Sequence, residues 1–82
     1  METIISTNII FKNNLAYHKK DNKPVTGYVL NLTGDYNESE DYIAYNNGIR
    51  YGFSRSYYCG DLTKSEYYKN GKVFLISKTL EL

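Results

Sequence analysis

The sequence predicts an all-β fold: an antiparallel β-meander of roughly seven short strands joined by Asn-Gly and Gly turns, which can be curved or rolled. The pairs Asn47-Gly48 and Asn70-Gly71 are the dipeptides that best fit tight hairpin turns. Between the turns, apolar and polar residues alternate with the period of a strand, and no stretch shows a helical period. Short strands linked by hairpins bring sequence neighbours together, which favours an antiparallel meander over a parallel sheet.

The N-terminal third contains the first two expected strands. Residues 3–11 are rich in β-branched side chains and end in three large apolar residues, which predicts a strand. The polar residues 12–14 form a turn, and residues 15–18 form a second short strand. A polar turn at 19–24 follows, where Pro24 has no N–H to donate and biases the preceding residue away from helix.

The middle of the chain alternates more clearly. In residues 26–32, Tyr28, Leu30 and Leu32 share one face. Residues 33–41 have no apolar periodicity and are expected to form an exposed acidic loop. After it we expect a strand at 42–45, a turn at Asn46-Asn47-Gly48 and a long strand over 49–58. On that strand, Ile49, Tyr51, Phe53, Arg55 and Tyr57 share an apolar face.

The C-terminal part completes the meander. After a turn at 59–61, residues 62–69 return as a strand, and Asn70-Gly71 turns the chain into a last strand over 73–80. This last strand is expected either to be covered by the N-terminal strand or to form an edge that another chain, including a second copy, can join.

Length and composition limit the possible classes. The 82 residues form one small domain, 1–82, with a thin core in which ten tyrosines supply much of the apolar surface. A net charge of +1 lacks the basic excess of most nucleic-acid binders. A single cysteine excludes an internal disulfide, and the N-terminus has no secretory signal, so we expect a cytoplasmic protein with no membrane association.

No catalytic or metal constellation is expected, and no cofactor. The only histidine and cysteine, His18 and Cys59, would have to meet in space to form a nucleophile and base. The alternation of oxygen-bearing side chains from Asp35 to Asp41 resembles a calcium loop, but Glu40 replaces the turn glycine. A solvated acidic loop is the first interpretation of this segment; among its functional interpretations, an acidic patch that docks on a basic partner surface is preferred over a metal site. The predicted partner-binding residues are Asp35, Glu38, Glu40, Asp41, Arg50, Arg55, Tyr57 and Tyr58.

The turn and strand pattern also resembles the MORN-type repeats, most closely the bacterial antitoxin-like variant, over about residues 15–74. The residues that carry the resemblance are Tyr45, Asn47-Gly48, Gly52, Tyr57-Tyr58, Gly60, Leu62, Glu66, Tyr68 and Asn70-Gly71-Lys72, with a degenerate earlier copy at Tyr17, Asn22-Lys23-Pro24 and Gly27. The third copy departs from the pattern, since Leu75 stands where the second has Gly52. The resemblance implies a β-hairpin array that works by protein contact without catalysis.

We therefore expect a protein that is not an enzyme and that binds and inhibits another protein, such as the toxin for which it is the immunity or antitoxin partner. A phage-type inhibitor of a host defence enzyme fits the same residues. The alternative is a nucleic-acid or small-ligand module in which tyrosines combine with Arg50, Arg55, Lys64 and Lys69.

Overall fold

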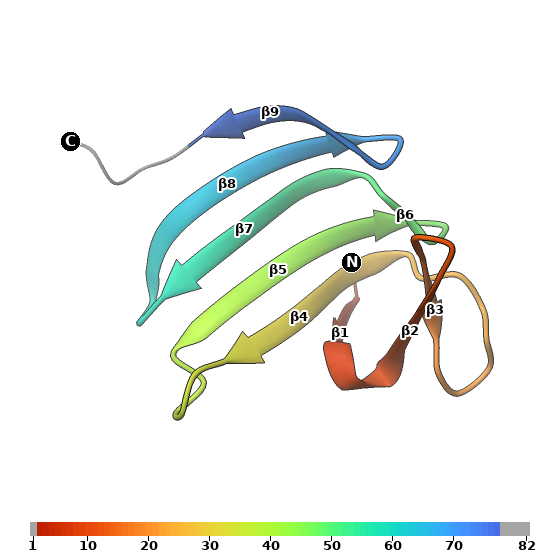
Figure 1. Cartoon of the computed structure of the whole chain (residues 1–82), viewed down its shortest axis with the longest axis horizontal. Helices are drawn as coiled ribbons and strands as arrows, with labels where there is room; N and C mark the ends of the chain where they lie inside the picture. The colour runs from red at the N-terminus through yellow and green to blue at the C-terminus, as the bar shows by residue number, and fades with distance from the viewer. Residues whose placement is uncertain (1, 78–82) are drawn as a thin grey trace.

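The computed structural model of this protein describes residues 2–77 and is all-β (Figure 1). An open, mostly antiparallel sheet of seven strands forms the body of the molecule, and a separate two-stranded hairpin packs on it. The elements are β1 (Thr3–Ile5), the 3-10 turn η1 (Ser6–Asn8), β2 (Ile9–Lys12), β3 (Leu15–His18), β4 (Gly27–Thr33), β5 (Ser39–Asn46), β6 (Ile49–Arg50), β7 (Gly52–Tyr58), β8 (Asp61–Lys69) and β9 (Lys72–Ser77).

The predicted meander is confirmed for the body of the sheet. The strand order is β1-β4-β5-β7-β8-β9, and the short β6 pairs with β5. From β4 onward the strands pair antiparallel in chain order, with the consecutive strands β6 and β7 both pairing with β5. The exception is β1, which joins the outer side of β4 in parallel.

The predicted first strand, residues 3–11, is wrong as a single element. The turn η1 divides it, so that β1 enters the main sheet while β2 pairs with β3 in the hairpin. Short polar side chains at 6–8 favour a turn because they can bond locally or across it, and the Ser6 hydroxyl donates to Asn31 Oδ1 at 3.1 Å. The turn also allows Ile4 and Ile9 to be buried in the same core.

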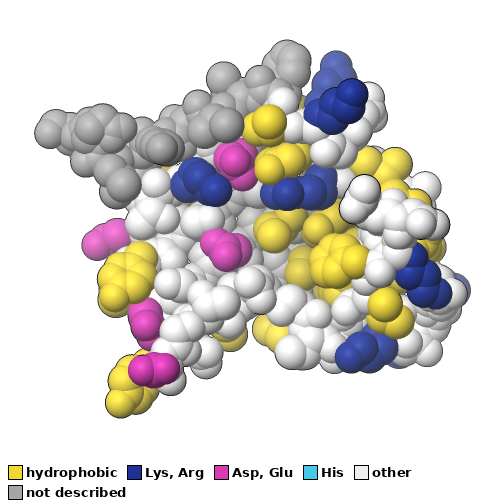
Figure 2. Space-filling view, in the orientation of Figure 1, with side chains coloured by type: hydrophobic (Ala, Val, Ile, Leu, Met, Phe, Trp, Pro, Cys, Tyr) yellow, Lys and Arg dark blue, Asp and Glu magenta, His cyan; other side chains and the backbone are white. Residues whose placement is uncertain are grey.

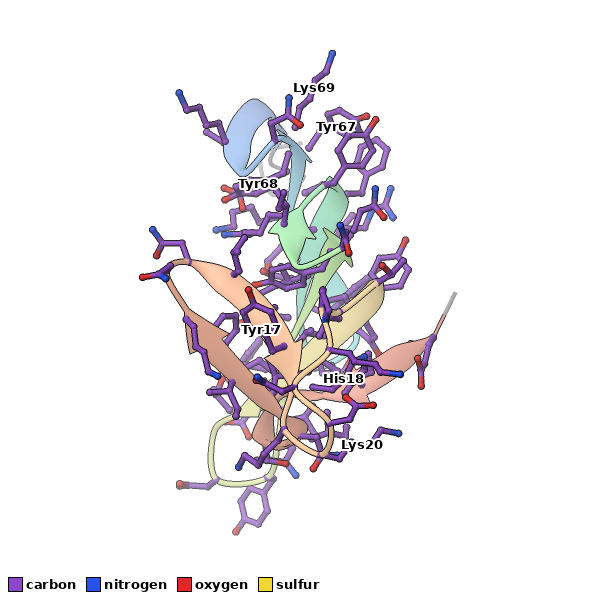
Figure 3. All side chains as sticks on the ribbon, turned by 90° about the vertical axis from the view of Figure 1, so that its right-hand side faces the viewer. Tyr17, His18, Lys20, Tyr67, Tyr68 and Lys69 are labelled. Atoms are coloured by element: carbon purple, nitrogen blue, oxygen red, sulfur yellow. The ribbon has the colours of Figure 1, made fainter. Side chains whose placement is uncertain are left out.

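That core cluster lies on one side of the sheet, while Ala44, 3% exposed, is buried on the other side next to Gly52. The β2–β3 hairpin folds over one face of β4 and β5, which we call the hairpin face (Figure 3). Backbone hydrogen bonds fix it there, since Ala16 N donates to Gly48 O at 2.9 Å and Gly48 N donates to Val25 O at 2.8 Å. The buried residues of the core cluster are Ile4, Ile9, Ala16, Val25, Val29 and Tyr45.

The predicted acidic loop over 33–41 is too long. Only residues 34–38 lie outside strands, because Glu40 and Asp41 continue the β4–β5 ladder opposite Leu32 and Asn31. The short loop between β4 and β5 is possible because Gly34 and Asn37 adopt the positive φ values, 94° and 57°, that such a loop requires. The carboxylates of residues 40 and 41 therefore belong to a central strand of the sheet.

In the C-terminal half, one prediction is wrong and one pair of alternatives is decided. The long strand predicted over 49–58 is interrupted at Tyr51, because Gly52 has a φ of 104° that a continuous strand does not adopt. The N-terminal strand does not cover the last strand, since β1 lies at the opposite edge of the sheet from β9. Within the described chain β9 is thus an edge strand, and residues 78–80 of its predicted span lie outside the described residues.

Residues 2–77 contain no helix that is both long enough and apolar enough to cross a membrane.

Candidate functional site

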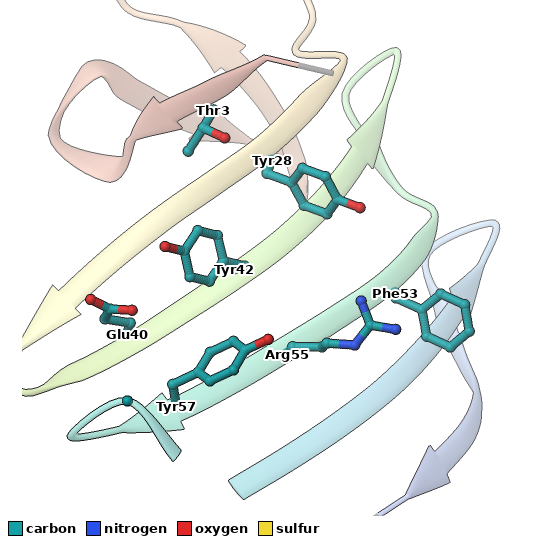
Figure 4. A pocket seen from close by; sticks show the side chains of 8 residues that line it. Thr3, Tyr28, Glu40, Tyr42, Phe53, Arg55 and Tyr57 are labelled. Atoms are coloured by element: carbon teal, nitrogen blue, oxygen red, sulfur yellow. The ribbon is translucent and has the colours of Figure 1, made fainter. Parts of the chain in front are cut away.

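The face of the sheet opposite the hairpin is covered by no other element of residues 2–77, and we call it the open face. Strand alternation brings aromatic residues from separate strands together there. The register places Tyr42 opposite Arg55, Glu40 opposite Tyr57, and Phe53 opposite Tyr67. A shallow groove of about 580 Å³ runs across this face (Figure 4). It is lined by Thr3, Tyr28, Glu40, Tyr42, Phe53, Arg55, Tyr57 and Gly60.

Tyr42 and Tyr57 line one end of the groove. The rings of Tyr42 and Tyr57 meet edge to face, with centroids 5.9 Å apart and planes at 90°. Such pairs stabilise by roughly 0.5–1.5 kcal/mol beyond their buried area, which holds both rings in place. Figure 4 shows both side chains projecting over the groove, beside the carboxylate of Glu40.

A second aromatic group occupies the other end. Phe53 packs against Tyr67 with centroids 5.0 Å apart, and the Arg55 guanidinium lies over the Phe53 ring at 4.6 Å. Arg55 is thus directed toward Phe53 and away from Glu40 (Figure 4). Among the residues that the structure describes, the one ion pair within 4 Å joins Lys64 to Glu66, so Glu40 has no basic partner in that part of the chain.

Tyr67 also contacts Tyr51, with ring centroids 6.4 Å apart. The pKa of Tyr67 is raised, chiefly because its ionisation would place a second negative charge beside Tyr51, with desolvation and a hydrogen bond to Tyr51 as smaller causes. The hydrogen bond and the ring contact together link Tyr67 to Tyr51.

The hairpin face carries a different, charged cluster outside the core. The Arg50 guanidinium stacks on the Tyr68 ring at 3.6 Å, and the Tyr68 hydroxyl donates to Glu66 Oε1 at 3.3 Å. Lys64 and Asp41 line the same hollow of about 250 Å³. The Ser54 hydroxyl and Arg50 Nε are buried there without a hydrogen-bond partner among the described residues. Figure 2, which looks onto this side, shows acidic and basic side chains close together. The hollow has no dominant charge.

The structure divides the predicted partner-binding residues. Glu40, Arg55 and Tyr57 meet in the groove of the open face. Asp41 and Arg50 line the hollow on the hairpin face, while Tyr58 is exposed at the end of β7. The remaining two, Asp35 and Glu38, lie in the loop between β4 and β5, where Glu38 Oε1 accepts a bond from Tyr36 N at 3.0 Å.

The charges are separated along the sheet. The 34–38 loop adjoins the turn between β7 and β8, where Cys59 N donates to Glu38 O at 2.8 Å. Acidic residues therefore gather at this end, namely Asp35, Glu38, Glu40 and Asp61. Lysines lie at the other end, in β2, the 19–24 turn and the β8–β9 turn. Figure 2 shows acidic side chains along the left side and basic ones along the right. The molecule thus has an acidic end and a basic end.

The described residues form neither a His18–Cys59 pair nor a calcium-type loop. His18 ends β3 at the hairpin, and Cys59 is exposed in the turn after β7 at the far end of the sheet, so these two do not meet. The alternating oxygen-bearing series does not form one loop, because Ser39 and Asp41 are paired in β5. Within residues 2–77, no three His, Cys, Asp or Glu side chains are grouped to hold a metal ion.

The predicted partner-binding residues did not include Tyr28, Tyr42, Phe53 and Tyr67, which the structure places on the open face. For Phe53, its alternation with Arg55 and Tyr57 along one predicted strand was a usable signal. What the sequence did not contain was the position of the hairpin, which covers the other face.

Comparison of the chain with protein-family models, with curated proteins and with solved structures gave no match. The resemblance to MORN-type repeats stays a prediction, and a function has to be argued from the geometry.

Proposed function

We propose that this protein binds and inhibits another protein, and that the open face is the contact surface. The observation that carries the proposal is an aromatic sheet face with no covering layer in residues 2–77. Tyrosine, phenylalanine and arginine are enriched at protein interfaces, and tyrosine and arginine dominate their hot spots. Here these residue types lie together in one groove, with Glu40 at its rim.

The size and rigidity of the sheet support this use. A standard interface buries about 800 Å² on each partner, and the molecule extends 43 × 31 Å along its two longer axes. The side chains of the groove project from paired strands and pack against one another, so little conformational entropy is lost when a partner binds them.

The acidic end favours a partner with a basic surface. Carboxylates in the 34–38 loop and in the adjoining turn lie next to the Glu40 end of the groove. Complementary charge accelerates association and fixes orientation. Toxins and defence enzymes that act on nucleic acids carry basic surfaces of this kind, so an immunity, antitoxin or phage inhibitor function is our proposal within this class.

A nucleic-acid platform receives less support. It would need the tyrosines and the basic residues on one face, but Arg50 and Lys64 line the hollow on the hairpin face whereas Arg55 lies on the open face. The groove of the open face contains one arginine and one glutamate, and single-strand binders need a positive excess to follow the phosphates. Binding to single-stranded RNA and DNA at several salt concentrations tests this alternative, since phosphate contacts produce a steep salt dependence.

The test of the proposal uses two adjacent tyrosines. Tyr57 lines the groove, whereas Tyr58 is exposed at the end of β7 and does not line it. A partner is first identified by cross-linking and mass spectrometry, and its affinity is then measured by calorimetry. We expect Tyr57→Ala to weaken binding at least tenfold, as truncation of a hot-spot tyrosine does, and Tyr58→Ala to change it less than threefold.

Circular dichroism and thermal unfolding establish that both variants are folded. The open-face proposal is contradicted if Tyr58→Ala weakens binding and Tyr57→Ala, still folded, does not.

A further inference from the structure

We propose that Tyr42, Tyr57 and Glu40 form an anchor site for one cationic side chain, a lysine or an arginine, of the protein partner. This inference rests on the proposed function and specifies the chemistry at one end of the contact surface.

The three residues come together through strand register. Tyr42 and Glu40 are two positions apart on β5 and so project from the same face, and Tyr57 on β7 lies directly opposite Glu40. The two rings are perpendicular, with centroids 5.9 Å apart, and therefore form two walls of a corner rather than a flat stack. Figure 4 shows the Glu40 carboxylate at the open side of this corner.

The negative charge of the Glu40 carboxylate favours a cation at this corner. Glu40 has no ion-pair partner in the described part of the chain, and the nearest base of the groove, Arg55, is occupied over the Phe53 ring at 4.6 Å. An ammonium or guanidinium group placed against the ring faces would interact with their negative quadrupoles and with the carboxylate. An anion would be repelled by both, and an apolar group would leave the carboxylate unpaired.

The surroundings strengthen the same preference. The loop with Asp35 and Glu38 and the turn with Asp61 lie at this end of the sheet, whereas the lysines of β2 and of the 19–24 turn lie at the other. The negative potential of the acidic end draws a basic residue toward the corner from a distance of about one Debye length, roughly 8–10 Å at moderate salt.

A probe experiment tests the site without a known partner. N-acetyl-lysine methylamide and N-acetyl-arginine methylamide are titrated into the ¹⁵N-labelled protein, and amide shifts are followed by NMR. We expect saturable shifts in the millimolar range at residues 40, 42 and 57. The same lysine probe carrying an acetylated Nε is neutral and should cause no shifts there. Absence of shifts with both cationic probes would overturn the proposal.

Two adjacent carboxylates provide a matched pair of variants. Glu40 and Asp41 follow each other on β5, but Glu40 lines the groove of the open face and Asp41 lines the hollow of the hairpin face. Glu40→Gln and Asp41→Asn change the net charge equally. We expect Glu40→Gln to weaken probe binding at least fivefold and Asp41→Asn to weaken it less than twofold. Equal losses in the two variants would show only a general acidic field and would refute an anchor site.

The outcome can be separated from that of the proposed function. If an identified protein partner is lost on Tyr57→Ala but retained at full affinity on Glu40→Gln, the open face is the interface and the cationic anchor is wrong. If the partner is lost on both substitutions and retained on Asp41→Asn, both proposals stand.

Discussion

At the scale of single residues, the tyrosines of this protein serve two purposes. Tyr45 is 5% exposed and belongs to the core under the hairpin, where its ring lies 6.2 Å from that of Phe11. Burial raises the pKa of Tyr45, because the phenolate would lose its hydration, and the nearby Arg50 opposes this shift only in part. Tyr42 and Tyr57, in contrast, pack against each other on the open face.

The raised pKa of Tyr45 predicts a loss of stability in alkaline solution. The unfolded chain releases the phenolic proton at about pH 10, its usual value, while the folded chain retains it to higher pH. Between these two pKa values the folded state binds more protons, so the free energy of unfolding falls as the pH rises, and the stabilisation is complete only below pH 10. Urea unfolding at pH 7 and pH 10.5 measures this decrease.

Tyr45→Phe keeps the ring and removes the titrating group. We expect the decrease between pH 7 and pH 10.5 to be smaller in this variant than in the original protein, with the lysines contributing equally to both. An identical decrease in the two proteins would show that Tyr45 does not cause the alkaline destabilisation.

At the scale of the elements, the first Asn-Gly turn has a tertiary role as well as a local one. Gly48 reverses the chain after β5. Its N–H donates to Val25 O, after the hairpin, and its C=O accepts from Ala16 N in β3. A Cβ at this position would lie 3.2 Å from Ala16 O. Gly60, in the turn after β7, has almost the same φ, 88° against 85°, but a Cβ there would meet nothing within 4 Å.

This pair of glycines separates backbone strain from hairpin docking. Gly60→Ala should reduce the free energy of unfolding by about 1 kcal/mol, because an L-residue is strained at positive φ. Gly48→Ala carries the same strain and also disturbs the contact with Ala16, so we expect a loss of about 2 kcal/mol or more. Chemical unfolding of both variants measures the difference, and equal losses would mean that the turn does not hold the hairpin.

Adjacent residues of β5 show a second property of the elements. The four acidic residues at 35, 38, 40 and 41 are close in sequence and suggest one acidic patch. Because β5 begins at Ser39, strand alternation sends the last two to opposite faces, and only residues 35 and 38 remain in the loop. These four residues are therefore close in sequence but do not form one acidic surface.

At the scale of the whole molecule, the core cluster lies on one side of a curved sheet. The hairpin covers part of one face, and the other face keeps its aromatic side chains without a second layer in residues 2–77. A chain of this length buries a smaller share of its surface on folding than a larger domain does, and here the core cluster lies under the hairpin. The core cluster and the proposed contact surface thus lie on opposite faces.

Two valines test this division. Val29 is 2% exposed under the hairpin, and Val73 is 46% exposed on the edge strand β9. We expect Val29→Ala to lower the free energy of unfolding by about 2 kcal/mol, because it leaves a cavity in the core. Val73→Ala should change it by less than about 0.5 kcal/mol. Similar losses at both positions, measured by urea unfolding, would contradict a core cluster that lies on the hairpin side.

The sequence by itself determined the all-β class, the antiparallel meander from β4 to β9 and the positions of the two Asn-Gly turns. These features depend on local chemistry: Asn and Gly tolerate positive φ, as at Asn47, Gly48, Asn70 and Gly71, and alternation sets which side chains share a face. It also placed Phe53, Arg55 and Tyr57 on one face, which the groove confirms.

Only the tertiary structure decided which face is covered. The break at Ser6–Asn8 sends β1 to one edge and β2 into the hairpin, and that hairpin then buries Val29 and Tyr45 while Tyr28, Tyr42 and Tyr57 remain on the other side. The alternation of side chains along a strand shows which residues share a face, but it does not show which of the two faces is buried. The choice between them depends on contacts between segments distant in sequence, such as Ala16 with Gly48. These contacts place Tyr45 in the core and leave Tyr42 on the face that we propose as the contact surface.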